Sequence, residues 1–247
     1  MTKLSDLLGG GSGGGVPLAA TAFAKPSIIL FETRPGTRTW TVPDGVTKIR
    51  AFVVGAGGNG GSFGRTGAGG GYSEKVYDVT SGAVINYTVG ATPGGTSSFD
   101  GPGGAITATG GESNQGAGGT GSGGDVNSSG GDGYEENGGA SSGHRFGNGI
   151  MASDRGGAGW GEDTGGNEGG SSGGMDGFGL GVVPGARKDQ ASSAEPADTH
   201  GYGCGGASAR NGGIGGGGGS GANGGIGGGG GGAGSGGFGL VGVEWLE

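Results

Sequence analysis

Hydrophobic and polar residues follow two different rules along this chain. In the first and last parts, β-branched and aromatic residues alternate with polar ones between Gly, Pro and Asp turns, which is typical of β-strands. We expect strands at 27–31, 38–42, 46–54, 72–79, 83–89, 96–99, 105–109 and 240–246. Turn signals at this spacing indicate a β-sandwich, and the last strand is expected to pair back onto the N-terminal sheet and close it.

The second rule governs 211–238, where glycine predominates and the other residues recur in steps of three. Residues sharing this phase are Asn211, Ile214, Ser220, Asn223, Ile226, Ser235 and Phe238. A β-strand would scatter them over both faces, because strand side chains alternate with a period of two. A left-handed helix with three residues per turn would place them along one edge and leave two glycine faces open to close packing.

Such a helix makes no internal hydrogen bonds, so its amides and carbonyls must bond to neighbouring copies. The same step recurs at Ala56, Asn59, Ser62, Arg65 and Ala68, and only Phe63 and Thr66 break it. The sequence therefore predicts a bundle of polyglycine II helices. Collagen is a weak alternative, because none of the 8 prolines follows Asp198.

These patterns divide the chain into two expected parts. Residues 1–26 would be an N-terminal docking peptide and flexible tether, with Leu4, Leu7 and Leu8 at helical spacing, or simply a frayed terminus. Residues 27–247 would form one glycine-rich β-sandwich domain. Its β core would comprise 27–109 plus 238–247, and the polyglycine II helix bundle would be an insertion at 110–237.

Composition restricts the possibilities further. Glycine accounts for 80 of 247 residues, against a usual share of roughly 7%, so a conventional hydrophobic core cannot extend throughout. Hydrogen bonds and close backbone packing must order the glycine tracts, and disorder is the alternative. The net charge of −8 disfavours nonspecific binding to nucleic acid or anionic membranes. The single cysteine, Cys204, excludes an intrachain disulfide framework.

The N-terminus lacks a hydrophobic signal region, and no apolar run approaches the roughly 20 residues of a membrane span. We therefore expect synthesis in the cytoplasm and no insertion into a membrane.

No motif indicates catalysis, a cofactor or a metal. Gly-x-Gly-x-x-Gly matches are expected by chance at this glycine content, and none lies in a βαβ unit. Ser, His and Asp occur without a nucleophile elbow. His144, His200 and Cys204 lack zinc-site spacing. Five aspartates among glycines do not repeat every nine residues, as a calcium nonapeptide array would: Asp125, Asp132, Asp154, Asp163 and Asp176. We expect a protein that is not an enzyme.

Several strand motifs stand in a recognisable order. They are Trp40-Thr41-Val42-Pro43-Asp44-Gly45-Val46 and its continuation to 58, followed by 69–74, 87–90, 95–99 and the close at 243–245. Together they resemble the glycine-rich domain of bacteriophage tail-fibre and tail-tip proteins. The glycine tracts are similar to those of the tail-fibre adhesins of T-even-type phages, whose polyglycine II sandwich carries variable loops that touch the host receptor. The resemblance implies a virion tail protein made in the host cytoplasm, with a homotrimer favoured by analogy.

Bulky and charged residues within 110–203 are the candidates for receptor contact, because a glycine lattice has little space for them. Aromatic rings and arginine are the usual anchors of recognition surfaces. The hypothesis assigns receptor binding to Tyr134, His144, Arg145, Phe146, Trp160, Arg187, Lys188 and Tyr202. Local packing or subunit contact is the alternative for each of them.

Three functions remain open. In the first, the chain recognises a host surface receptor, a glycan or an outer-membrane protein. In the second, it is a purely structural tail component that joins other phage tail proteins. In the third, it is a non-viral glycine-helix bundle, such as an ice-binding or surface-coat protein. That class predicts a flat face of small residues, and the bulky 110–203 segment argues against it.

Overall fold

The computed structural model describes residues 28–135, 138–151 and 211–246, and all secondary structure in them is β, as expected, with no helix. The strands of the first half are β1 (Ile28–Glu32), β2 (Gly36–Thr41), β3 (Lys48–Val54), β4 (Tyr72–Asp78) and β5 (Val84–Val89). The others are β6 (Ser97–Phe99), β7 (Ile106–Ala108), β8 (Gly121–Ser122), β9 (Val126–Ser128) and β10 (Leu240–Leu246). Every predicted strand is present, whereas the alternating pattern does not predict β8 and β9.

The strands form two antiparallel sheets. Sheet A has the order β1-β10-β3-β4-β9, and sheet B has the order β2-β5-β6-β7-β8. The final strand β10 lies between β1 and β3, in register from Leu240 opposite Val54 to Leu246 opposite Lys48. The C-terminal strand therefore pairs back onto the N-terminal part of sheet A, as its sequence indicates.

A hydrophobic core joins the two sheets. Sheet A contributes alternate residues of β3, β4 and β10, and sheet B contributes alternate residues of β5, β6 and β7. The ring of Phe99 is central to it, with Trp40 and Tyr77 at centroid distances of 6.2 and 5.8 Å. Burial of these side chains is the conventional source of stability in this half of the molecule.

The outer face of sheet A is also covered. Phe52, Val54, Tyr72 and Leu240 form a second buried cluster there, against which Val126, Ile214 and Ile226 pack. Because Ile214 and Ile226 come from the glycine tract, that tract covers the sheet. Two-sided burial explains why the last four residues of β3 are all buried.

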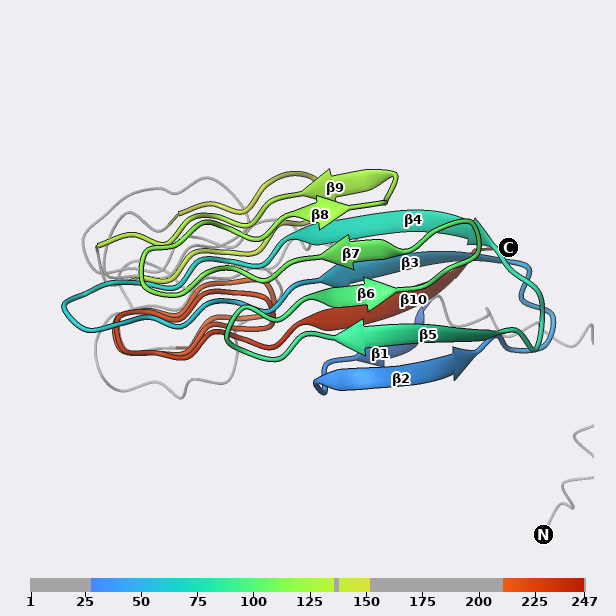
Figure 1. Cartoon of the computed structure of the whole chain (residues 1–247), viewed down its shortest axis with the longest axis horizontal. Helices are drawn as coiled ribbons and strands as arrows, with labels where there is room; N and C mark the ends of the chain where they lie inside the picture. Colours follow the sequence, from blue (N-terminus) through green and yellow to red (C-terminus); the bar gives the residue numbers. More distant parts are fainter. Residues whose placement is uncertain (1–27, 136–137, 152–210, 247) are drawn as a thin grey trace, which may run out of the picture.

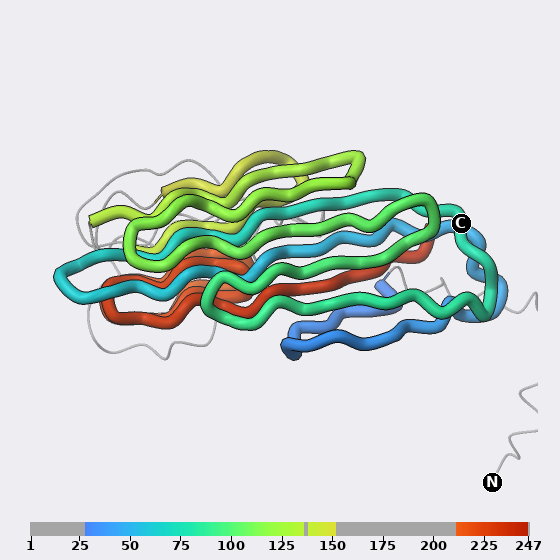
Figure 2. Tube along the Cα trace, viewed as in Figure 1, coloured from blue at the N-terminus to red at the C-terminus, as the bar shows by residue number. Residues whose placement is uncertain are grey.

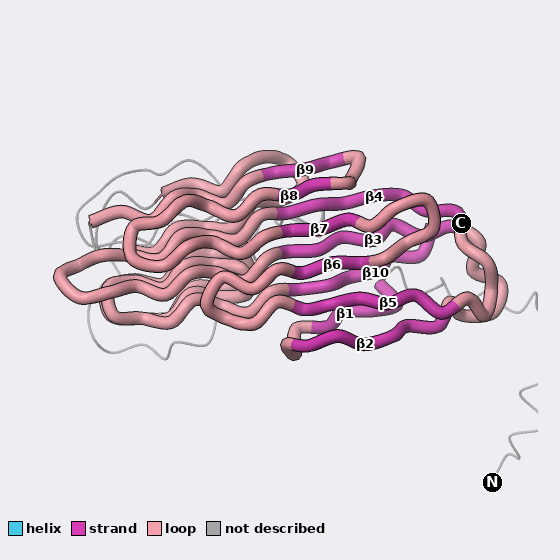
Figure 3. Tube along the Cα trace, in the orientation of Figure 1, coloured by secondary structure: helices cyan, strands magenta, loops and turns pink. Residues whose placement is uncertain are grey.

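Glycine-rich segments continue the strands beyond one end of both sheets (Figures 1 and 2). The chain leaves β3, runs through 55–62, turns and returns through 65–71 to β4, and similar excursions follow β5, β7 and β9. In Figure 3 these segments are drawn as loops, since they form no β ladder, yet they run side by side. The molecule therefore has a pleated half and a glycine half.

In the glycine half, backbone amides three residues apart bond to the same neighbouring segment, and successive amides bond to different ones. A pleated strand directs its amides to two sides only, so this pattern is not a β ladder. In each of the following pairs the amide of the first residue donates to the carbonyl of the second: Gly55 and Gly71, Gly58 and Ala68, Gly57 and Gly237, Gly60 and Gly234, Ala56 and Gly95, Gly67 and Gly230, and Gly70 and Gly227. Their N···O distances lie between 2.7 and 3.0 Å.

Close backbone contact explains why these positions are glycine. A methyl group on Gly57 would overlap the carbonyl group of Gly228, and one on Gly70 would overlap the carbonyl group of Gly55. In both cases the obstacle is rigid main chain. The missing side chain is thus a packing requirement here.

The tract 211–238 does not run as one long helix. Hydrogen bonds close reverse turns at 213–216, 219–222, 225–228 and 231–234, so the chain changes direction every six residues. The third residue of each turn has a positive φ, as a type II turn requires: Gly215, Gly221, Gly227 and Ala233.

A twelve-residue repeat accompanies these turns. The side-chain oxygen of Asn211 accepts a hydrogen bond from the backbone amide of Asn223 at 3.0 Å. In the same way, the side-chain oxygen of Asn223 accepts one from the backbone amide of Ser235 at 2.9 Å. Ile214 and Ile226 occupy equivalent turns. The three-residue step in the sequence does not reveal this reversal, although the asparagines and the isoleucines each recur after twelve residues.

Candidate functional site

Two places in the described residues gather distinctive side chains. We call the first the distal tip; it consists of the turns 61–66, 112–116 and 231–234 and the segment 132–135, at the end of the glycine half. We call the second the charged cluster; it consists of Arg50, Tyr72, Glu74, Arg145 and Glu244 on the outer face of sheet A.

Hydrogen bonds to the backbone bring the four segments of the distal tip together. The carbonyl of Gly61 accepts from the amide of Ala233 at 3.0 Å. The carbonyl of Thr66 accepts from the amide of Gln115 at 2.8 Å. The amide and hydroxyl of Thr66 both donate to the carbonyl of Tyr134 at 3.0 Å. Segments far apart in sequence therefore present their turns at one place.

Phe63 is the most unusual residue of the tip. It is 99% exposed and has a φ of 63°, a conformation that costs a residue other than glycine roughly 1–2 kcal/mol. Such an exposed aromatic ring cannot stabilise the isolated chain by burial. The conformational strain is thus not offset by packing within the described residues.

Polar side chains and a second aromatic ring lie on the turn of Phe63 and on the segments bonded to it. Tyr134 is 46% exposed. The other exposed or half-exposed polar side chains of the tip are Ser62, Arg65, Glu112, Ser113, Asn114, Gln115, Asp132 and Glu135. This is a surface suited to recognition, because aromatic rings supply contact area and the amides and charges supply hydrogen bonds.

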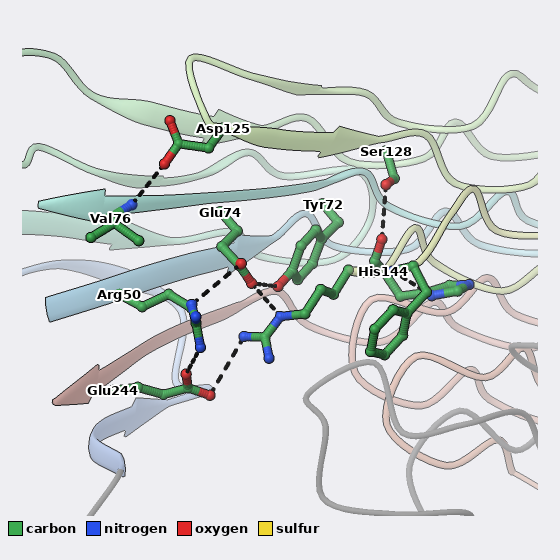
Figure 4. Close-up of polar contacts among 10 residues, drawn as sticks. Arg50, Tyr72, Glu74, Val76, Asp125, Ser128, His144 and Glu244 are labelled. Atoms are coloured by element: carbon green, nitrogen blue, oxygen red, sulfur yellow. Dashed lines mark hydrogen bonds and ion pairs between the residues drawn. The ribbon is translucent and has the colours of Figure 1, made fainter. Parts of the chain in front are cut away.

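The charged cluster is built from two carboxylates and two guanidinium groups (Figure 4). Glu74 of β4 accepts from the Arg145 Nε and the Tyr72 hydroxyl, each at 2.6 Å. Glu244 of β10 lies 2.9 Å from Arg50 and 3.6 Å from Arg145. Both glutamates are less than 10% exposed. The formal charges balance, as burial requires.

Tyr72 completes the cluster as a hydrogen-bond donor. Burial and the neighbouring Glu74 carboxylate raise the pKa of the Tyr72 phenol well above its usual value. The phenol therefore stays protonated and continues to donate to Glu74. The cluster has a structural explanation: it attaches the loop that carries Arg145 to sheet A.

The loop 144–147 is a tight turn closed by backbone bonds between His144 and Gly147. The Ser128 hydroxyl donates to the carbonyl of His144 at 2.8 Å, a contact that is also visible in Figure 4. Burial lowers the pKa of His144 to about 4, so its imidazole is neutral at pH 7. Phe146 is 54% exposed, with its ring 6.4 Å from that of His144.

The structure separates the predicted receptor-binding residues that it describes. Tyr134 belongs to the distal tip through its bonds to Thr66, whereas His144, Arg145 and Phe146 lie on the outer face of sheet A. Arg145 is engaged by two glutamates. The remaining predictions lie outside the described residues: Trp160, Arg187, Lys188 and Tyr202, and the docking residues Leu4, Leu7 and Leu8.

Sequence reasoning missed Phe63 as a site residue, although a signal was present. Phe63 is out of phase with the three-residue step that runs from Ala56 to Ala68. A bulky residue that interrupts a glycine lattice must leave it, and the hairpin turn with Gly64 is where it does so. The tip residues Asn114 and Gln115 carry no comparable signal.

The described residues contain no group of three potential metal ligands and no helix able to cross a bilayer. No protein-family model matches the chain, and no curated protein matches it.

Proposed function

We propose that this protein is a bacteriophage tail-fibre or tail-tip protein that recognises the host cell surface through the distal tip of a polyglycine II scaffold. The scaffold would be a β-sandwich whose excursions form a bundle of short polyglycine II helices. Hydrogen bonds with a period of three that reach several neighbours support that geometry, because a helix with three residues per turn directs its amides in three directions.

The single observation that carries the receptor role is the exposure of Phe63 in a strained conformation. An aromatic ring that is 99% exposed at a turn with positive φ contributes nothing to folding. A contact with something outside the chain accounts for it. Tyr134 and the polar side chains of the adjoining turns extend this contact surface.

The rigidity of the scaffold suits this role. A turn held by a backbone lattice presents its side chain without first ordering a loop, so little conformational entropy is lost on binding. The proposed partners are a host surface receptor, a glycan or an outer-membrane protein, and other phage tail proteins in the virion. A homotrimer is the expected assembly by analogy with tail fibres.

Binding of the purified full-length chain to host cells tests the proposal. We expect the Phe63→Ala/Tyr134→Ala variant to bind at least tenfold more weakly than the original chain, because both rings lie at the contact. Val84→Ala is the matched control, since Val84 is an exposed apolar residue of β5, 64% exposed and outside the tip.

Equal binding of the tip variant and the original chain would contradict the receptor role. Binding to isolated tail proteins that depends on Phe63, without binding to cells, would instead favour the purely structural component.

A further inference from the structure

Asparagine followed by glycine is a dipeptide prone to spontaneous deamidation, one reason why asparagine is a thermolabile residue. The glycine amide nitrogen attacks Cγ of the asparagine and gives its hydrogen to the departing side-chain amide, which leaves as ammonia. The succinimide ring that forms is then opened by water to aspartate or isoaspartate. The chain has five such pairs, and four lie wholly in the residues that the structure describes: Asn59-Gly60, Asn148-Gly149, Asn211-Gly212 and Asn223-Gly224.

The pair Asn223-Gly224 makes two hydrogen bonds to one residue of a neighbouring segment. The side-chain oxygen of Asn223 accepts from the amide of Ser235 at 2.9 Å. The amide of Gly224 donates to the carbonyl of Ser235, also at 2.9 Å. We call this arrangement an Asn-Gly clamp: the asparagine oxygen and the following glycine amide both bond to the backbone of the same neighbouring segment.

Two further pairs form the same clamp. Asn211-Gly212 holds the amide and the carbonyl of Asn223, each at 3.0 Å. Asn148-Gly149 holds the amide of Ser129 at 2.9 Å and its carbonyl at 2.7 Å. The clamp therefore does not depend on the twelve-residue repeat, because Asn148 lies outside it.

The fourth pair, Asn59-Gly60, bonds to two nearby residues of one segment. Its asparagine oxygen accepts from the amide of Gly236 at 2.9 Å, and its glycine amide donates to the carbonyl of Gly234 at 2.8 Å. The Thr92 hydroxyl donates to the same asparagine oxygen at 3.2 Å. In all four pairs, the nitrogen that would attack and the side chain that would be attacked are both engaged.

Burial does not account for any protection of these asparagines. Asn148, Asn211 and Asn223 are exposed and Asn59 is half-buried, so water reaches them. Geometry is the remaining source of protection, since attack requires the nitrogen and Cγ to approach with their orbitals aligned. In a clamp the glycine N–H is directed at a neighbouring carbonyl, and the carboxamide is held by a second bond.

We propose that the Asn-Gly clamps protect four asparagines from spontaneous deamidation: Asn59, Asn148, Asn211 and Asn223. The reaction requires the clamp to open, and local unfolding of the segments it joins provides the opening. The dipeptide that fastens one segment to the next is thus kept intact by the bonds it makes. This inference does not depend on the function proposed for the distal tip.

The first test measures deamidation of the folded full-length chain in mildly alkaline buffer. Peptide mapping by mass spectrometry quantifies aspartate and isoaspartate at each pair. The references are the same chain unfolded in guanidinium and synthetic peptides that span each pair. We expect the folded chain to react at least about tenfold more slowly than both references at all four positions, because both bonds of a clamp must open first. Equal rates in the folded chain and the peptides overturn the proposal.

The second test opens one clamp. Ser235→Pro removes the amide that donates to Asn223 but keeps the carbonyl that accepts from Gly224. Ser235 does not have a positive φ, and proline suits an extended helix with three residues per turn. We expect Asn223 to deamidate at least about threefold faster once its side chain is released. Ser235→Ala is the matched control, because it keeps the amide and should react as the original chain does.

The other three pairs serve as internal references in the Ser235→Pro variant, and their rates should not change. An unchanged or slower rate at Asn223 overturns the proposal, because the bond to its oxygen would then polarise the carboxamide rather than restrain it. Equal acceleration at all four pairs also overturns it, since general loosening of the fold would then explain the result.

A faster reaction of Asn223 in Ser235→Ala would likewise contradict the role of the Ser235 amide.

Discussion

The pleated half and the glycine half of this molecule are ordered by opposite means. In the pleated half, large side chains such as Phe99, Ile49 and Val53 fill the space between the sheets. In the glycine half, the absence of side chains lets backbones bond directly to one another, as at Gly57 and Gly70. The comparison teaches that a methyl group can stabilise one half of a chain and be intolerable in the other.

The largest expected effect comes from adding a methyl group to the glycine half. We expect Gly57→Ala to destabilise the protein by about 3 kcal/mol or more, because the added carbon overlaps main-chain atoms of Gly228 that cannot move aside. Chemical denaturation measures this. Gly147→Ala is the control, since its nearest obstacle is the His144 ring at 4.0 Å. If both variants unfold at the same denaturant concentration, the lattice is not close-packed.

The converse experiment removes part of a buried side chain from the pleated half. Ile49 is fully buried, so Ile49→Ala is expected to cost about 2–5 kcal/mol through lost burial and the cavity left behind. The same denaturation assay applies. A cost below about 1 kcal/mol would show that the pleated half does not depend on its core.

A third effect probes the charged cluster that attaches the 144–147 loop to sheet A. Arg145→Ala leaves the Glu74 and Glu244 carboxylates without one of their two cations, and we expect a loss of about 2–3 kcal/mol. Thermal unfolding provides the measurement. Combining Arg145→Ala with Glu74→Gln should recover part of the loss, and a fully additive double variant would contradict the pairing.

The pH dependence of stability concerns His144, whose turn is bonded to Ser128 of sheet A. Its pKa of about 4 in the folded state lies below the usual 6.5, so the unfolded chain binds more protons between these values. Stability should therefore fall as the pH falls from about 6.5 to 4, by about 1–2 kcal/mol after allowance for partial exposure. Denaturation at several pH values measures it, with His144→Gln as the comparison because carboxylates also titrate. If stability changes equally with pH in the original chain and in the His144→Gln variant, the lowered pKa of His144 is contradicted.

The smallest effect is a gain in stability at the tip. Phe63→Gly relieves a positive φ and loses no buried surface, so stability should rise by up to about 1 kcal/mol while binding to host cells falls. Ala233→Gly, which relieves the same strain at the fourth turn of 211–238, should stabilise the chain to a similar extent and leave the ring of Phe63 in place. Loss of stability in Phe63→Gly would imply that its ring packs within the chain.

Much of the pleated half could be predicted from the sequence, because alternation over five to seven residues specifies strands such as β3 and β10. The short strand β8 could not, since Gly121 and Ser122 carry no hydrophobic pattern. In the glycine half the three-residue step was visible, but the turns at Gly215 and Gly221 depend on which of many glycines adopts a positive φ. A stretch made almost entirely of glycine does not show which of its residues will adopt the positive φ of a turn.

The candidate site was predictable only in part. Tyr134 was predicted to bind the receptor, and its 46% exposed side chain lies at the distal tip, whose contact role is the proposal. Arg145 looks like a recognition residue in the sequence, yet its partners Glu74 and Glu244 lie 71 and 99 positions away, and only the fold brings them together. Long-range ion pairs of this kind leave no local pattern.

Hydrogen exchange of the glycine amides tests most directly whether backbone bonding orders the glycine half. The amides of Gly57, Gly67, Gly70 and Gly229 donate to carbonyls of other segments at 2.8, 2.8, 2.7 and 2.9 Å. We predict that they exchange as slowly as the amides of β3 and β10, because opening them requires the whole lattice to separate. Exchange at the rate of an unstructured peptide, while β3 and β10 stay protected, would contradict the account.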